Sequence, residues 1–387
     1  MLIKKDVLCV IILPWVVFHL SLLLPIISPE YEHVNFEYSL FFFVLFFIFY
    51  AFFIFGLQVK SKKAICLEVD SVVKIFLFIL IIALVSRVLD RFLIRAPSNY
   101  FSISSYRVSR EAGSNIFSIL SVILFPVAIF LYNKIRTVPG KMLSAVNVFF
   151  FFSISFFLFD VVLSGSRGTA LVVFVSLFFD KINKKNIIFF GSAFVVVSGV
   201  FFIFRFQSLT EVESISKTLL YLSSVGYSDF VPASDFFMSM MQESDFRLLY
   251  FSVVQITQYI AHGFFEFAYV YNTQPIVQFD PSRLIPQLSK ISSFNSYLER
   301  ENLYYTLMGT LYISFGAFSI FASAIIGLGL GFLYKRSVLI SKNAKGVVFL
   351  SVFMAPFVNG VGGYDIHFFL LAIYIVSVVR LKNKYVQ

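Results

Sequence analysis

The sequence predicts an all-α polytopic integral membrane protein with about ten transmembrane helices, both termini cytoplasmic and one large outer loop that carries amphipathic helices. Of the 387 residues, 59% are hydrophobic and only 13% are charged, about half the charged share of a soluble domain, which is roughly 25%. Several apolar runs approach or exceed the roughly 18 residues that a membrane-spanning helix needs. Runs such as "LFFFVLFFIFYAFFIFGL" lack the alternation of barrel strands, and open sheet edges cannot face lipid.

Ten apolar runs are interpreted as spans. The first follows Lys4 and Lys5, as a signal sequence does, but it contains Pro14 and Pro25 and lacks a small-residue cleavage site. We therefore interpret it as an uncleaved span. The sixth run is short, and the eighth is long enough to include a re-entrant or tilted lead-in. The predicted spans are 7–27, 39–57, 72–89, 116–132, 143–163, 169–180, 187–204, 307–334, 346–362 and 364–379.

The distribution of Lys and Arg sets the predicted orientation. With the N-terminus inside, all six inner segments are basic, and the acidic "SPEYEHVNFEY" falls outside, as the positive-inside rule requires. The net charge of +10 is thereby explained by the inner loops, and no nucleic-acid partner is expected. The predicted organisation is a membrane half at 1–204 with seven spans and an outer loop at 90–115, a large outer loop at 205–306, and three spans at 307–387.

Residues 250–271 are apolar enough to be an eleventh span. A crossing there would place "KRSVLISKNAKG" and the basic tail outside, which breaks the charge rule twice. Four polar residues fall within about 80° of one another on a helical wheel. We therefore expect an amphipathic helix in the interface or packed over the membrane domain. The four residues are Gln255, Gln258, His262 and Glu266.

Arginines retained on the predicted outer side are the first candidate binding residues. A guanidinium stays charged and offers a fork of donors that suits phosphate and pyrophosphate. The alternative for each is a pair with a nearby acid or a lipid headgroup. The set consists of Arg91, Arg95, Arg107, Arg110, Arg167, Arg205, Arg247, Arg283 and Arg300.

Arg167 stands in a short loop, "SGSRG", between two apolar runs. Gly165 and Gly168 permit a tight turn, and Ser166 can cap the following helix, whose amino end favours anions. The loop is either a phosphate cradle or a helix corner with a snorkelling arginine. Asp160, one turn earlier, is expected to pair with Arg167.

Candidate acid–base residues are Glu266 and His262, which share one helical stripe. A base that deprotonates a sugar hydroxyl needs a carboxylate or an imidazole within hydrogen-bond reach. The alternative is a solvated helix face. Asp365 and His367, at the outer mouth of the last span, are either functional or at the surface. Other acids of the large loop are equally open, namely Asp229, Asp235, Glu243, Asp245, Glu299 and Glu301.

Two motifs and the layout resemble the Wzy-type O-antigen or oligosaccharide repeat-unit polymerases of bacterial inner membranes. One motif is "LSGSRG", which opens a short span. The other is "NLYYTLMGTLYISFGAFSIFASAIIGLGLGFLYKR" from Asn302, in which Thr, Gly, Tyr and a Phe-Gly pair precede a glycine-rich span. The motifs cover about 40 residues of the chain, and the layout covers nearly all of it. The paired R-x10-G motif of some members has no counterpart on the outer side.

The resemblance implies a glycosyltransferase of lipopolysaccharide biosynthesis that acts on the periplasmic face. Such an enzyme moves a growing glycan from undecaprenyl pyrophosphate onto the sugar terminus of a new carrier-linked repeat unit. Arginines would neutralise the leaving group, so no metal or nucleotide cofactor is expected. The expected partners are the undecaprenyl-pyrophosphate-linked oligosaccharide, the lipid bilayer and a chain-length regulator of the same pathway.

Three other functions fit parts of the pattern. An O-antigen ligase shares the donor and a large outer loop. A flippase for lipid-linked oligosaccharides would carry basic residues along a central cavity, whereas here the charges gather in outer loops. A membrane acyltransferase would show an early His/Arg pair near a cytoplasmic acyl donor, which the sequence lacks.

Overall fold

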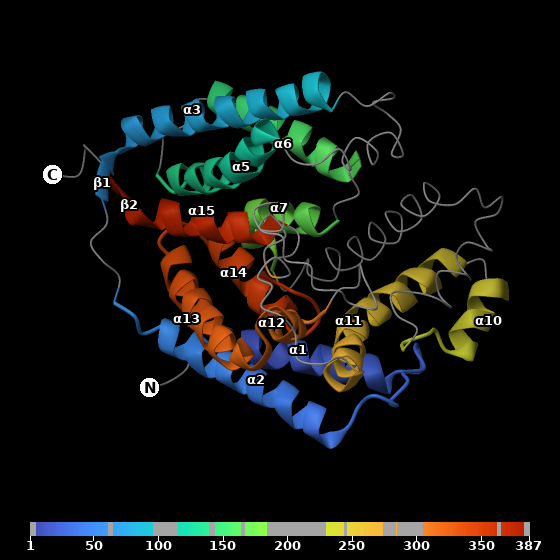
Figure 1. Cartoon of the computed structure of the whole chain (residues 1–387). Helices are drawn as coiled ribbons and strands as arrows, with labels where there is room; N and C mark the ends of the chain where they lie inside the picture. Colours follow the sequence, from blue (N-terminus) through green and yellow to red (C-terminus); the bar gives the residue numbers. More distant parts are fainter. Residues whose placement is uncertain are drawn as a thin grey trace. The chain divides into compact units, whose positions relative to one another are not determined.

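The computed structural model is mostly helical (Figure 1). It describes residues 5–60, 65–95, 115–138, 144–163, 167–183, 230–243, 246–273, 284, 305–361 and 365–382. The chain divides into two compact units. The first comprises Met1–Leu57, Lys184–Gly331 and Phe349–Gly363, and the second comprises Gln58–Asn183, Phe332–Val348 and Tyr364–Gln387.

The first unit holds seven helices or parts of helices that lie within the described ranges. They are α1 (Lys5–Leu23), α2 (Phe36–Gly56), α10 (Asp235–Glu243), α11 (Arg247–Thr273), α12 (Leu307–Phe315) and α13 (Ser319–Ser337) as far as Gly331, followed by the end of α14 (Lys342–Met354). Its core is largely aromatic. Trp15 meets Phe46 edge-on with ring centroids 5.0 Å apart, and the Tyr38 hydroxyl donates to the Phe264 carbonyl at 2.6 Å.

A sharp break divides the predicted eighth span. Helix α12 ends at Phe315, a 3-10 turn (η5) covers Gly316–Phe318, and α13 begins at Ser319. Gly316 has φ 55° and ψ −129°, a backbone conformation that favours glycine because it lacks a Cβ. The predicted lead-in is therefore a separate short helix. Thr306 caps its start by accepting from the Gly309 amide at 3.0 Å.

The second unit is built on three long helices and a small strand pair. Its elements are β1 (Ile65–Glu68), α3 (Val69–Val88), the π-helix η1 (Leu89–Ile94), α5 (Ile116–Ile135), α6 (Ser144–Leu163), α7 (Arg167–Phe178), the 3-10 turn η2 (Phe179–Lys181), α15 (Ile366–Val378) and β2 (Val379–Lys382), with the adjoining ends of α13 and α14. Helix α5 packs against both α3 and α15. Strands β1 and β2 pair in parallel, with Ile65 opposite Val379.

Five helical segments of the described chain are long and apolar enough to cross a membrane. They are Phe36–Gly56, Val69–Ile94, Ile116–Ile135, Ser144–Val161 and Leu307–Ser337, and two shorter apolar helices are Val7–Leu23 and Ile366–Val378. These apolar helices indicate insertion into a lipid bilayer, and the all-α class agrees with the structure. The count of about ten spans stays a prediction, and the predicted span at 187–204 lies outside the described residues.

One predicted helix end differs from the structure. The third predicted span ends at 89, whereas η1 continues α3 through Ile94. The segment at 250–271 is a helix, as expected, and α11 is not among the helices apolar enough to span a membrane. Its polar stripe is not solvated, however. Gln255, Gln258, His262 and Glu266 are all at most 2% exposed, so the solvated-face interpretation is wrong.

Candidate functional site

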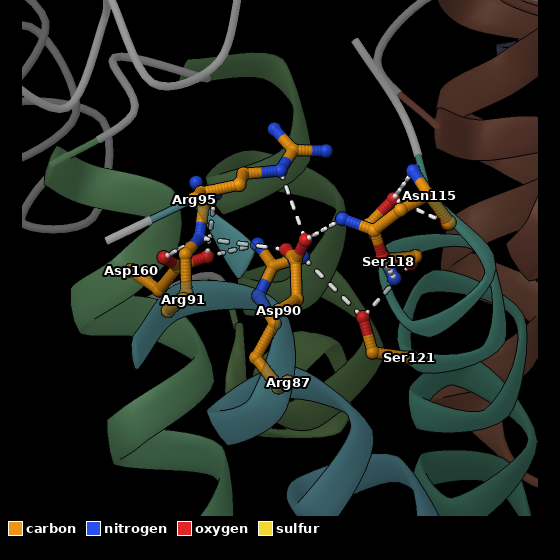
Figure 2. Close-up of polar contacts among 8 residues, drawn as sticks. All are labelled: Arg87, Asp90, Arg91, Arg95, Asn115, Ser118, Ser121 and Asp160. Atoms are coloured by element: carbon orange, nitrogen blue, oxygen red, sulfur yellow. Dashed lines mark hydrogen bonds and ion pairs between the residues drawn. The ribbon is translucent and has the colours of Figure 1, made fainter. Parts of the chain in front are cut away.

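A buried cluster of arginines and aspartates lies where α3 passes into η1, within the second unit (Figure 2). It is formed by side chains of α3, η1, α5 and α6. The α3–η1 segment brings the first side chains together by helical spacing, since residues three and four apart share a face. The cluster consists of Arg87, Asp90, Arg91, Arg95, Asn115, Ser118, Ser121 and Asp160.

Asp160 is the counterion of two arginines. Its carboxylate forms ion pairs with Arg87 and Arg91, and its Oδ2 accepts from Arg91 Nη2 at 3.2 Å. Asp160 is 1% exposed, and Arg87 and Arg91 are 6% and 3% exposed. Burying a lone charge costs several kcal/mol, so charges this deep require partners. Arg87 also donates to the Ser121 hydroxyl at 3.3 Å.

Asp90 joins the other half of the cluster. Its Oδ1 accepts from Arg95 Nε at 2.9 Å and from Asn115 Nδ2 at 2.5 Å. Asn115 is also the N-cap of α5, where its Oδ1 accepts from the Ser118 amide and Ser118 Oγ accepts in return from the Asn115 amide. This capping box fixes the Asn115 side chain, so the α5 terminus holds Asp90 in place.

The π-helix sets the position of Arg95. The Arg95 amide donates to the Asp90 carbonyl at 2.9 Å, five residues back, the spacing that defines a π-helix, a rare form often found at functional sites. Burial lowers the pKa of Arg95, and the neighbouring Asp90 carboxylate opposes that shift. An arginine nonetheless stays charged. Among the described residues, three arginines thus face two aspartates.

The α11 stripe forms a second buried polar set, in the first unit. Gln255 Nε2 donates to Gln258 Oε1 at 2.9 Å, and Gln258 Nε2 donates to the Val231 carbonyl at 3.0 Å. His262 Nδ1 lies 3.1 Å from the Gln258 carbonyl and 3.0 Å from the Tyr259 carbonyl. Two carbonyls can only accept, so Nδ1 carries the proton of neutral His262 and Nε2 is the basic nitrogen. Glu266 lies one turn further along the helix.

The remaining predicted site residues divide by where they fall. Arg167 begins α7, with Gly168 in its first turn, and the Arg167 side chain lies outside the description. Arg247 begins α11 and is half-buried. Asp160, expected to pair with Arg167, instead has Arg87 and Arg91 as its described partners. Gly165, Ser166, Arg107, Arg110, Arg205, Arg283 and Arg300 lie outside the described residues.

Sequence reasoning missed Arg87, Asp90 and Asn115. The signal for Arg87 and Arg91 was their spacing of four residues at the end of an apolar run, because ionisable groups there need buried partners. A second contact was also missed. Thr169 Oγ1 donates to Asp365 Oδ2 at 3.1 Å, and Asp365 adopts a left-handed conformation with φ 59°, unusual for a residue with a side chain.

In the described ranges, no three His, Cys, Asp or Glu side chains gather closely enough to hold a metal ion. The fold and the cluster together define the class of the protein, a helical membrane protein with a buried, cation-rich polar centre. Comparison with known proteins adds no family to that class. No protein-family model, curated protein or solved structure matches the chain.

Proposed function

We propose that the chain is an O-antigen repeat-unit polymerase of the bacterial inner membrane, with its active site on the periplasmic face. The observation that carries the proposal is the excess of arginine over aspartate buried at the end of apolar helices. A fork of charged donors in a place of low dielectric favours phosphoryl oxygens. This is what holding a lipid-linked pyrophosphate would require.

The charge rule supports the placement of this cluster on the outer side. It directs α3 and α6 outward and α5 inward, which brings Arg91, Asn115 and Asp160 to outer helix ends. The contact of Asp160 with Arg91 agrees with that arrangement. So does the pairing of β1 with β2, because both strands belong to segments that the rule assigns to the inner side.

The proposed reaction is a glycosyl transfer. The acceptor hydroxyl oxygen forms a bond to the anomeric carbon of the donor glycan, and its proton passes to a base. The bond from that carbon to the pyrophosphate oxygen breaks, and the carrier pyrophosphate leaves with the electron pair. Arginines would stabilise the charge that develops on it. His262, through Nε2, and Glu266 are the proposed acid–base residues.

Deletion of the gene in a bacterium that displays polymeric O antigen tests the proposal. We expect lipid A core that bears a single repeat unit, restored to polymer by the wild-type gene. Loss of all O antigen with accumulation of carrier-linked polymer would instead identify a ligase. Loss of all O antigen with accumulation of unpolymerised carrier-linked units would identify a flippase, and either result would overturn the proposal.

The same strain tests Arg167. Arg167→Ala is expected to abolish polymer while the protein is still inserted, measured by immunoblot of membranes. Arg136→Ala is the matched control, because Arg136 has a side chain 42% exposed in a long 3.8 Å pair with Asp180. Near-normal polymer lengths in Arg167→Ala would show that Arg167 only anchors the membrane topology, and would contradict its role in substrate binding.

A further inference from the structure

The three arginines of the cluster differ in what their guanidinium groups contact. Arg87 and Arg91 both turn toward the Asp160 carboxylate. Arg95 contacts Asp90 through Nε alone. Figure 2 shows its two terminal nitrogens pointing away from the cluster, and among the described residues no group accepts a hydrogen bond from them. Yet the Arg95 side chain is only 8% exposed.

The two carboxylates are shared among the three arginines. Asp160 cannot neutralise more than one of the two arginines that share it, and Asp90 lies 3.8 Å from Arg91 as well as 2.9 Å from Arg95. Each carboxylate oxygen near Arg95 is thus already shared. Two terminal nitrogens that lie side by side and point away from the cluster match the spacing of two oxygens of one phosphate.

A chain of contacts from α5 fixes the orientation of the Arg95 guanidinium. Asn115 Nδ2 donates to Asp90 Oδ1, and the same oxygen accepts from Arg95 Nε. Because Nε is held, the plane of the guanidinium is fixed and its terminal nitrogens must face outward. Groups held in place before a ligand arrives lose less entropy on binding it.

We propose that Arg95 is the residue of the cluster that contacts a phosphate group borne by a lipid, and that Asp90 and Asn115 are positioning residues that aim it. Arg87 and Arg91, which share Asp160, are then a scaffold. The lipid pyrophosphate as ligand rests on the proposed function, whereas the contact itself rests on the geometry of Arg95.

Binding is measured with the purified full-length chain in phosphatidylcholine nanodiscs, titrated with geranyl pyrophosphate and with inorganic pyrophosphate. Arg95→Gln should weaken geranyl pyrophosphate at least about tenfold, the equivalent of about 1.4 kcal/mol. Arg136→Gln, which removes an equal charge from the exposed pair with Asp180, should bind as the wild type does. Arg95→Lys should recover only part of the loss, since a lysine keeps the charge but not the fork.

The positioning role has its own variant. Asn115→Ser keeps a good N-cap for α5 and removes the amide donor to Asp90. We expect a severalfold loss of geranyl pyrophosphate binding at an unchanged melting temperature. A lowered melting temperature with normal binding would make Asn115 structural only. Wild-type binding by Arg95→Gln would overturn the assignment of Arg95.

Further measurements distinguish the possible sources of the phosphate, and they test the Arg95 proposal separately from the polymerase proposal. Competition by phosphatidylglycerol in the nanodisc would identify a phospholipid headgroup as the phosphate, and inorganic pyrophosphate binding as tightly as the geranyl form would identify a free anion. Loss of binding in Arg95→Gln without a single-repeat phenotype on gene deletion would keep the phosphate contact and overturn the polymerase. The single-repeat phenotype together with wild-type binding by Arg95→Gln would keep the polymerase and overturn the phosphate contact of Arg95.

Discussion

In the second unit, the ion pairs of Asp160 join side chains of different helices, as Asp160 of α6 joins Arg87 of α3. In the first unit the close contacts between helices are made instead by backbone. A Cβ added to Gly327 would lie 2.2 Å from the Phe49 carbonyl oxygen, and one added to Gly331 would lie 2.0 Å from that of Phe53. The second unit should therefore be sensitive to charge, and the first to volume.

The comparison also separates two ways of burying polar groups. Around Asp160 the partners are charged, so the loss of one leaves another uncompensated. On α11 several partners are backbone carbonyls, as Val231 is for Gln258, so a substitution there strands a neutral group, which costs less. A buried charge cluster is thus the more fragile of the two, and it is also the one in which arginines outnumber aspartates among the described residues.

The largest effect is expected for Asp160→Asn. It keeps the volume but removes the carboxylate charge with which Arg87 and Arg91 pair, and breaking a buried pair costs about 3–5 kcal/mol of unfolding free energy. Thermal and denaturant unfolding in detergent measure the loss. Asp180→Asn is the control, because its pair with Arg136 is 3.8 Å long and exposed, worth about 0–1 kcal/mol. Equal losses in both variants would contradict a charge-dependent second unit.

Next in size is Gly331→Ala in the first unit. The new Cβ would collide with a backbone carbonyl, which cannot turn aside as a side chain can, so α13 and α2 must move apart at about 2–3 kcal/mol. Gly329→Ala is an ideal control on the same helix, because nothing lies within 4 Å of its Cβ position. The free energies of unfolding of the two variants, measured in parallel, should differ. Equal stability in both would contradict the close approach of α13 and α2.

Gln258→Met is expected to cost about 1–2 kcal/mol. Methionine fills a similar volume but leaves the Val231 carbonyl without the donor that now lies 3.0 Å away. Gln242→Met on α10 serves as its control, because Gln242 is exposed. Chemical denaturation gives both values. A cost near that of Asp160→Asn would show that the α11 stripe depends on charge as well.

The elements of the fold could be read from the sequence more fully than the site. Long apolar runs predict helices because their side chains need only be buried in the protein or face lipid. The runs at 39–57 and 116–132 are helical, as predicted. The charge rule also led us to leave 250–271 out of the spans. The interior environment of α11 did not follow from its pattern, since a polar stripe looks the same whether it faces water or other helices.

The site depends on pairs that are distant in sequence. Arg87 and Asp160 are 73 residues apart, so each by itself resembles a charge snorkelling at a helix end. The extra residue of the η1 π-helix, which turns Arg95 toward Asp90, leaves no trace in hydrophobic periodicity. Asp160, one turn before the motif at 164–168, is predicted from the sequence to pair with Arg167, whereas its described partners are Arg87 and Arg91.

The smallest effect is expected for Thr169→Val, in the second unit but without removal of a charge. Valine keeps the shape and removes the hydroxyl that donates to Asp365 at 3.1 Å, at about 1 kcal/mol, because Asp365 is partly exposed and water can replace the donor. Thr137→Val is the control, since its hydroxyl donates to the Lys134 carbonyl three residues back, at the end of α5. Unfolding of both variants beside Asp160→Asn decides whether charge pairs or hydrogen bonds in general hold this unit. If Thr169→Val were as costly as Asp160→Asn, the contrast between the two units would be one of polarity and not of charge.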